Sequence, residues 1–195
     1  MLFVAVPIVL GIIAAALKIW VLAGVMMILA GFMVFFFRDP KRRAPVDDDI
    51  VVSAADGKVT RVEKRDEGVF VSVFLSPFDV HINRAPISGM VEKVRLFKGL
   101  KKPATSDSAS VTNERNAVTI KGQKMTVVCT QIVGILARRI VCRAKVGDRV
   151  TGGEKIGLIR FGSRTDLLMP KDVKVFVRPG DRVKGGETVI AKLDS

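Results

Sequence analysis

Three residue types that together support nucleophilic chemistry occur in distinctive local sequences of this chain. Ser163 follows Gly162 in the run FGSR, and His81, the only histidine, lies between two prolines in SPFDVHINRAP. Asp56 lies in the turn sequence ADGK. A serine hydroxyl attacks a carbonyl once a base removes its proton, and histidine and aspartate can serve as that base or orient it. Each residue alone also has a structural interpretation, because Gly-Ser and Asp-Gly pairs are common in turns.

The Gly-Ser pair stands between two copies of one turn motif. The copies are GDRVTGGEKIG, beginning at Gly147, and GDRVKGGETVI, which begins 33 positions later at Gly180. In each copy Gly-Asp supplies a turn, Val enters the core, and Gly-Gly-Glu turns again before an apolar strand. Two such units related by pseudo-symmetry predict a small flattened barrel. We expect FGSR to form an exposed hairpin tip between them.

These repeats resemble the hammerhead motif of biotinyl and lipoyl carrier domains. Those carriers hold a modifiable lysine at the hairpin tip, whereas the tip predicted here contains Gly162, Ser163 and Arg164. The pair Lys124-Met125 resembles part of a biotinyl signature but lies before the first repeat. The sequence therefore predicts the scaffold of a carrier without its acceptor.

Charge and aromatic content narrow the partners of the chain. Its 32 Lys and Arg and 19 Asp and Glu give a net charge of +13, which favours anionic partners. The chain has no tyrosine and one tryptophan, Trp20, so it lacks a platform for stacking bases. We therefore expect an anionic membrane rather than a nucleic acid as partner. With one histidine and no CxxC pair, Cys129 and Cys142 predict small buried residues, and no metal site is expected.

The first 37 residues predict a membrane anchor. Residues 2–17 and 21–37 are apolar runs separated by Lys18-Ile19-Trp20, and Lys18 is the only charged residue before Arg38. One helix of this length would exceed the hydrocarbon core, so a hairpin of two short transmembrane helices fits better than a single tilted span. A cleaved signal peptide fits less well because the run is too long. The basic residues that follow predict a cell-membrane location with the remaining domain on the cytoplasmic side.

The rest of the chain predicts a mainly β domain after a basic linker. Residues 38–49 form the linker, in which Pro40 and Pro45 prevent a continuing helix. Residues 50–195 alternate short runs rich in Val, Ile and Phe with turns, and the predicted strands are residues 50–53, 59–62, 69–75, 90–96, 118–120, 125–130 and 140–144. Residues 131–137 fit either a strand or a short helix. Residues 98–115 are polar and predict a long surface loop.

Four segments resemble the short form of the phosphatidylserine decarboxylase family. They are FFFRDPKRRAP, SAADGKV, SPFDVHINRAP and IRFGSRTDLLMP, which begin at residues 35, 53, 76 and 159. Together they span most of the chain after the anchor, in a specific order and spacing. The fold expected from the resemblance and the repeats is a barrel-sandwich-like β domain behind a membrane-anchoring helical hairpin.

The resemblance implies that the chain makes its own cofactor. The Ser163 hydroxyl would attack the Gly162 carbonyl, and β-elimination of the resulting ester would separate residues 1–162 from residues 163–195. Ser163 would become a pyruvoyl group that forms a Schiff base with the substrate amine and accepts electrons during decarboxylation, without pyridoxal phosphate or metal. The substrate would be a serine phospholipid, either phosphatidylserine or its archaetidyl equivalent. The two fragments would stay together as a heterodimer or assemble into a higher oligomer.

Two positions depart from the family pattern. Larger bacterial members carry a second histidine three positions after the first, and here Arg84 occupies that position. Arginine stays protonated and is a poor base, so either Asp56 acts alone in self-cleavage or His81 serves both self-cleavage and decarboxylation. Phe161 replaces the Leu or Val more usual before Gly-Ser. Candidates for binding the lipid phosphate are, by charge alone, Arg138, Arg139 and Arg164.

Two other functions compete with a decarboxylase. A carrier domain would gain mass on a lysine and stay in one piece. A membrane-anchored adaptor of an export machine would use the same kind of barrel without catalysis. Such adaptors usually insert a long helical arm between barrel halves, and the residues between the two repeats are too few for one.

Overall fold

The computed structural model describes residues 2–45, 47–104, 106, 108–135, 139–159 and 162–194. They form two compact units, Met1–Pro40 and Lys41–Ser195. Each unit is considered by itself below.

The first unit is a helical hairpin. Helix α1 (Leu2–Ala16) and helix α2 (Trp20–Phe36) are separated by a turn in which Lys18 has a positive φ of 59°. A Cβ atom on Gly11 would lie 3.3 Å from Cβ of Met26, so the helices pack closely, and the rings of Phe3 and Phe37 stack at 6.0 Å. The predicted helical hairpin is therefore present. Within the described residues neither of these helices has both the length and the apolar character needed to cross a bilayer, so the predicted transmembrane spans are not confirmed.

The second unit is mainly β, as predicted, with one short helix, α3 (Ala109–Thr112). Its strands are β1 (Ile50–Val52), β2 (Gly57–Arg65), β3 (Gly68–Leu75), β4 (Ile82–Arg84), β5 (Gly89–Phe97), β6 (Arg115–Lys121), β7 (Thr126–Val133), β8 (Ile140–Cys142), β9 (Arg149–Val150), β10 (Lys155–Ile159), β11 (Ser163–Met169), β12 (Val173–Val175), β13 (Arg182–Val183) and β14 (Val189–Leu193). Strand β7 extends to Val133, which resolves the ambiguity over residues 131–133 in favour of a strand.

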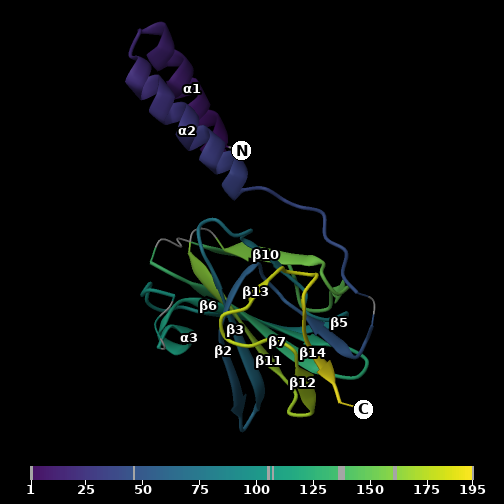
Figure 1. Cartoon of the computed structure of the whole chain (residues 1–195). Helices are drawn as coiled ribbons and strands as arrows, with labels where there is room; N and C mark the ends of the chain where they lie inside the picture. The colour runs from purple at the N-terminus through teal and green to yellow at the C-terminus, as the bar shows by residue number, and fades with distance from the viewer. Residues whose placement is uncertain are drawn as a thin grey trace. The chain divides into compact units, whose positions relative to one another are not determined.

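Eight strands form one curled sheet in the order β13-β2-β3-β11-β7-β6-β5-β9, and Figure 1 shows it bent into a half-barrel. Two three-stranded sheets, β1-β14-β12 and β4-β10-β8, complete the unit. All neighbours in these sheets are antiparallel, so directly opposed residues share a face. The row Val71, Leu167 and Cys129 is buried on the inner face, where it joins the main hydrophobic core.

The large sheet has an internal pseudo-two-fold symmetry, whose axis passes between β11 and β7. This symmetry pairs β13 with β9, β2 with β5 and β3 with β6, and it exchanges the two small sheets. The repeated turns match in detail. Gly147 and Gly180 have φ of 93° and 104°, and Gly153 and Gly186 have φ of 80° and 76°. The predicted pseudo-symmetric repeat is thus confirmed in its backbone geometry.

The segment between the repeats differs from the predicted exposed hairpin tip. Strand β10 pairs with β4 and β8, whereas β11 pairs with β3 and β7, so the connection crosses from a small sheet to the large one. Ser163 is the first residue of β11 and is fully buried. The hairpin expectation was wrong because each repeat pairs with an earlier part of the chain rather than with the other repeat. Arg160 and Phe161 lie outside the described residues.

Candidate active site

The Gly162-Ser163 peptide lies at the start of a central strand. Ser163 is opposite Leu75 of β3 on one side and Val133 of β7 on the other. Its Oγ is buried and has no hydrogen-bond partner among the described residues. Gly162 has a φ of 57°, a left-handed conformation that glycine adopts without strain. Burial of a hydroxyl without a hydrogen-bond partner costs free energy, and a catalytic role is one reason for a protein to keep such a group. This serine is therefore a candidate nucleophile.

Gly134 is in backbone contact with the same peptide. A Cβ atom built on Gly134 would lie 2.3 Å from the carbonyl oxygen of Gly162 and 3.2 Å from its carbonyl carbon. Only a residue without a side chain allows this approach. The carbonyl that Ser163 would attack is therefore held against the end of β7, a contact that the sequence did not reveal.

His81 is held by the turn that follows β3. The Asp79 carboxylate accepts hydrogen bonds from the amide and the hydroxyl of Ser76 at 2.8 and 2.6 Å, which closes the turn. His81 Nδ1 lies 2.9 Å from the carbonyl oxygen of Asp79. A carbonyl can only accept, so Nδ1 carries a proton, and whenever the ring is neutral its lone pair is on Nε2. The imidazole is thus oriented as a potential base.

The backbone brings His81 and Ser163 to the same end of the molecule. The carbonyl of His81 accepts a hydrogen bond from the amide of Ile159 at 3.2 Å, and Ser163 follows four residues later. Leu75, which pairs with Ser163, immediately precedes the turn that carries His81. His81 and Ser163 therefore lie near the same end of β3, although they are 82 positions apart in sequence.

Asp56 lies at this end of the sheet, two strands away from Ser163. Its Oδ1 accepts from the amide of Gly185 at 2.8 Å, and its Oδ2 pairs with Arg42 at 2.6 Å. Burial raises the pKa of this carboxyl, an effect that the Gly185 amide and Arg42 oppose and that Asp79 reinforces. Asp56 is thus a partly buried carboxylate held by the second repeat, without a direct bond to His81 or Ser163 among the described contacts.

Arg84 has a structural environment. Its Nη1 donates to the carbonyl of Gly153 at 2.9 Å. Its side chain also packs against Gly186, because a Cβ atom built on Gly186 would lie 2.8 Å from Cδ of Arg84. The guanidinium therefore lies between the Gly-Gly turns of the two repeats, and its charge lowers the pKa of Asp56. The neighbouring Asn83 points to the other face of β4, toward Thr165.

A chain of buried amides links the strand that follows His81 to the strand that begins at Ser163. Asn83 donates to Thr165 at 2.8 Å and accepts from Gln131 at 2.8 Å, and Gln131 accepts from Asn116 at 3.1 Å. All four side chains are buried. A Cβ atom on Gly157 would lie 2.9 Å from Nε2 of Gln131, so that glycine makes room for the chain. These bonds hold β4, which follows His81, against β11.

Of the arginines predicted to bind phosphate, Arg164 is engaged inside the protein. It is 1% exposed and forms a 2.8 Å ion pair with Asp166. Its guanidinium also bonds to the hydroxyl of Ser110 in α3. Arg139 is exposed, and Arg138 lies outside the described residues.

Comparison with known proteins gives this arrangement a family. Residues 29–191 match the family described as phosphatidylserine decarboxylase. The chain is 48% identical to the phosphatidylserine decarboxylase proenzyme of Saccharopolyspora erythraea over 96% of this chain and 86% of that protein. It is 45% identical to the corresponding proenzyme of Solibacter usitatus, over 92% and 89% of the two chains. The chain belongs to the phosphatidylserine decarboxylase family.

The family assignment makes the protein a carboxy-lyase related to proenzymes of phospholipid biosynthesis. Relatives include a putative archaetidylserine decarboxylase proenzyme of Methanococcoides burtonii, which is 45% identical over 89% of this chain and 81% of that protein. The predicted family and enzyme class are confirmed. Within the described residues no three His, Cys, Asp or Glu side chains gather as a metal site, and independence from metal stays a prediction.

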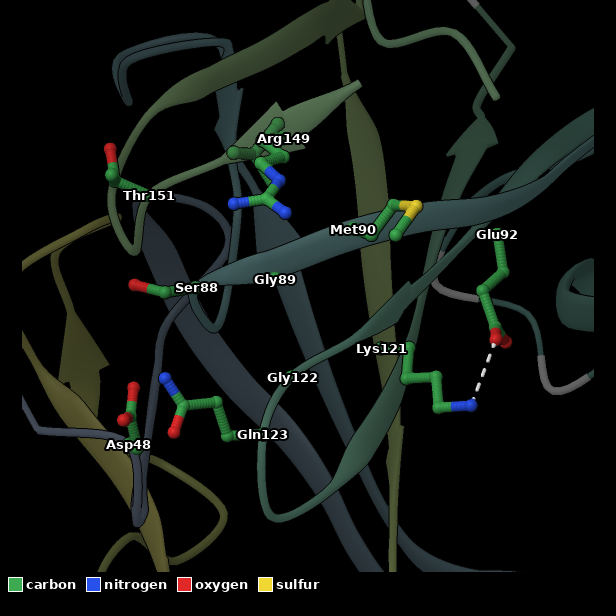
Figure 2. Close-up of a pocket in the computed structure, with 11 residues that line it drawn as sticks. Asp48, Ser88, Gly89, Met90, Glu92, Lys121, Gly122, Gln123, Arg149 and Thr151 are labelled. Carbon is green, nitrogen blue, oxygen red and sulfur yellow. Dashed lines mark ion pairs between the residues drawn. The ribbon is translucent and has the colours of Figure 1, made fainter. Parts of the chain in front are cut away.

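In this phosphatidylserine decarboxylase family member, a pocket lies at the symmetry-related end of the sheet, without the candidate chemistry. A cavity of about 620 Å³ lies at the opposite end of the sheet. There Ser88 takes the place of Asp56 and accepts from the amide of Gly152 at 2.9 Å, as Asp56 does from Gly185. Figure 2 shows Ser88, Gln123 and Asp48 on one side of this pocket and the Lys121–Glu92 ion pair on another. Neither a histidine nor a Gly-Ser pair lines it.

Sequence reasoning missed three residues that support the site. Arg42, assigned to the linker, pairs with Asp56 and with Glu187 at 3.1 Å. Asp79, within the family segment SPFDVHINRAP, orients His81 and pairs with Arg182 at 2.8 Å. The spacing Ser-x-x-Asp in that segment is typical of a side-chain-closed turn and could have identified Asp79. Nothing local to Gly134 indicated its role.

Proposed function

We propose that this protein cleaves itself between Gly162 and Ser163 and then decarboxylates a serine phospholipid. The observation that carries the proposal is the buried, unpartnered Oγ of Ser163 beside a carbonyl that Gly134 holds in place. Oγ adds to the carbonyl carbon of Gly162, and the peptide nitrogen leaves to give an ester. Loss of the Ser163 α-proton then expels the Gly162 carboxylate, and the dehydroalanine left behind takes up water and releases ammonia. The products are residues 1–162 and a residue 163–195 fragment that begins with a pyruvoyl group.

The residues around Ser163 fit such a group. Its position is central and dry, between β3 and β7, and the neighbouring Thr165 is held by Asn83. When formed, the pyruvoyl carbonyl supplies an electron sink for the pair left as carbon dioxide departs. His81 is the side chain proposed to move a proton in the decarboxylation, because Asp79 fixes the ring with its basic nitrogen on the opposite side.

Asp56 is proposed to act in self-cleavage. Its pKa is raised, which brings the carboxylate closer to the range in which it can accept a proton near neutral pH. Asp56 is two strands from Ser163, so it cannot accept the Ser163 proton directly. The proton must pass through a water molecule or through the turn that contains Asp79. The alternative is that His81 alone is the base for both steps. It is favoured because the carbonyl of His81 bonds to the amide of Ile159, four residues before Ser163.

We propose further that the protein works at an anionic membrane, with the β unit on the cytoplasmic side. The support is the apolar surface of the α1–α2 hairpin, on which Trp20, Val21 and Ile28 are all at least 70% exposed, and the net charge of +13. The substrate class is the serine headgroup, which ester-linked and ether-linked lipids share. The cleaved fragments are proposed to remain together, because β11 is paired on both sides with strands of the longer fragment.

A mass spectrum of the purified wild-type protein tests the proposal. It is expected to show two polypeptides that correspond to residues 1–162 and 163–195, the smaller blocked to N-terminal sequencing. Ser163→Ala is expected to yield one intact chain that releases no carbon dioxide from phosphatidylserine. An intact wild-type chain that is active would overturn the mechanism, and added mass on a lysine would favour a carrier.

A further inference from the structure

The internal symmetry is broken at one prominent place. The hairpin between β2 and β3 is closed by Asp66 and Glu67 alone. Its symmetry mate, between β5 and β6, is interrupted by residues 98–114, which include α3. The two hairpins otherwise correspond closely, since each has one bulge, between Val59 and Arg61 and between Val91 and Lys93. Residues 98–114 are therefore an addition to one half only.

The inserted segment lies at the end of the sheet that carries Ser163. The β5–β6 ladder ends where Phe97 pairs with Arg115, Arg115 pairs with Ile132, and Ile132 precedes the partner of Ser163. The β2–β3 tip is at the other end, opposite Met169. The added segment therefore lies beside the candidate nucleophile and not beside the pocket at the opposite end of the sheet.

Buried polar contacts hold the inserted segment in a defined position. Asn113 is fully buried, and its side-chain amide donates to the carbonyls of Lys102 and Val133 at 2.8 and 2.9 Å. Its Oδ1 accepts from the amide of Lys102 at 3.2 Å. Arg164 and Asp166 of β11 both bond to Ser110 of α3. The segment is therefore anchored to β11, the strand that begins at Ser163, and to its neighbour β7.

The outer surface of this region combines apolar and basic side chains. In the second unit nine large apolar side chains are exposed among the described residues, and five of them belong to this region. We call these five the apolar rim: Leu96, Phe97, Leu100, Val111 and Ile135. In the sequence, residues 95–115 and 135–139 contain seven basic residues, Arg95, Lys98, Lys101, Lys102, Arg115, Arg138 and Arg139, against the two acidic residues Asp107 and Glu114. Exposed apolar groups among cations are the composition of surfaces that enter the interface of an anionic bilayer.

We propose that the apolar rim and its lysines dock on the surface of an anionic lipid bilayer and bring the headgroup layer to Ser163. This inference rests on the proposed function, in which the substrate is a membrane lipid. The apolar side chains enter the interface, the lysines and arginines pair with lipid phosphates, and the aliphatic stems of the lysines lie against the acyl region. The added segment thereby distinguishes the end of a nearly symmetric fold that carries Ser163 from the end that lacks the candidate residues.

Lipid contact is tested directly with a fluorescent label on the full-length chain. Val111→Cys and the control Phe176→Cys, which is just beyond β12, carry an environment-sensitive dye. Cys142→Ser is introduced in both, and Cys129 is fully buried with a raised thiol pKa, so it does not react. On vesicles of phosphatidylglycerol and phosphatidylcholine, quenchers attached to the lipid chains are expected to quench the dye at position 111 and not at position 176. Equal quenching at both positions, or none at 111, overturns the proposal.

Substrate presentation is tested with matched double variants. Leu100→Asp with Val111→Asp is compared with Val146→Asp with Phe176→Asp, which replaces two similarly exposed apolar residues away from Ser163 with the same charge change. The rim variant is expected to lose roughly tenfold or more of its kcat/KM on phosphatidylserine in vesicles, since burial of one such side chain is worth about that factor. Both variants should cleave themselves and turn over monomeric short-chain phosphatidylserine like the wild type.

The outcomes separate this inference from the proposed function. If the rim variant loses activity equally on vesicles and on the monomeric lipid, or on neither, the docking role is refuted. If the wild-type protein releases no carbon dioxide from either substrate, the proposed function fails, while the quenching experiment still decides whether the rim touches lipid. A dye at position 111 that responds only to an added protein would assign the rim to a protein partner instead.

Discussion

Gly134 and Gly162 meet backbone to backbone, so that a methyl group on Gly134 would come within 2.3 Å of the Gly162 carbonyl oxygen. The contact links the end of β7 to the peptide that self-cleavage would break. Because the attack of a hydroxyl on a carbonyl depends on their relative position to a fraction of an ångström, this contact should control the rate of processing.

Gly134→Ala is expected to slow self-cleavage by roughly 100-fold, the cost of a displacement of about 1 Å at a reacting centre. The measurement is the time course of precursor disappearance on denaturing gels after cell-free synthesis. Gly24→Ala, which adds a methyl where no atom lies within 4 Å, is the matched control and should process normally. Processing of Gly134→Ala at the wild-type rate would contradict a role for this contact.

His81 and Asp56 are expected to separate the two reactions. His81→Ala should lower carbon dioxide release by about 100-fold or more, the usual contribution of a general acid or base. Asp56→Ala should accumulate uncleaved precursor. Gel analysis reports the first reaction and carbon dioxide release by the processed fraction reports the second. If His81→Ala also stays uncleaved, the histidine serves both steps, and normal processing by Asp56→Ala would remove the aspartate from the mechanism.

The pH dependence of processing should report Asp56. Burial raises its pKa above the ordinary value of 3.8, so the carboxylate that accepts a proton becomes populated only at a higher pH. The rate of precursor cleavage should therefore rise with pH along an acid limb whose midpoint lies above 3.8. Asp56→Asn should process slowly, and its residual cleavage, followed over long times, should lack this limb. An unchanged limb in that variant would assign it to another group.

The same pKa direction predicts a stability effect with a definite sign. The folded protein keeps a proton on Asp56 where the unfolded chain has lost it, so this group lowers the free energy of unfolding as pH rises from the unfolded pKa through the folded one. In Ser163→Ala, which stays intact, urea unfolding across this window should show a steeper fall in stability with Asp56 than with Asp56→Asn. The reverse order would mean that Arg42 and Gly185 outweigh burial.

The buried amide chain should matter for stability and for processing together. Gln131→Leu removes the donor to Asn83 and leaves Asn116 and Asn83 with unmatched polar groups, a cost of about 1–3 kcal/mol for each. Urea unfolding of the Ser163→Ala background measures the loss. Thr60→Val, which removes a longer 3.2 Å bond to Ser72, should cost less. Equal losses in the free energy of unfolding would show that the buried amides contribute no more than an ordinary hydrogen bond.

Several features followed from the sequence because they depend on neighbouring residues. The break at Lys18-Ile19-Trp20 predicted the helical hairpin, since one helix through the whole apolar run would exceed the hydrocarbon core. The repeated GDRV and GGE turns predicted matching backbone conformations, because glycine at fixed spacing dictates where φ becomes positive. The family segments predicted the enzyme class, and the comparisons confirm it.

Other features depend on pairing between distant strands and required the tertiary structure. The burial of Ser163 follows from the pairing of β11 with β3 and β7, which no local pattern around FGSR encodes. Arg42 looked like part of a linker until the fold brought Asp56 and Glu187 to it. The close contact between Gly134 and the Gly162 carbonyl depends on where β7 ends in the folded protein. Local sequence sets the conformation of turns and the alternation of strands, whereas long-range register decides which carbonyl, hydroxyl and charge share one place.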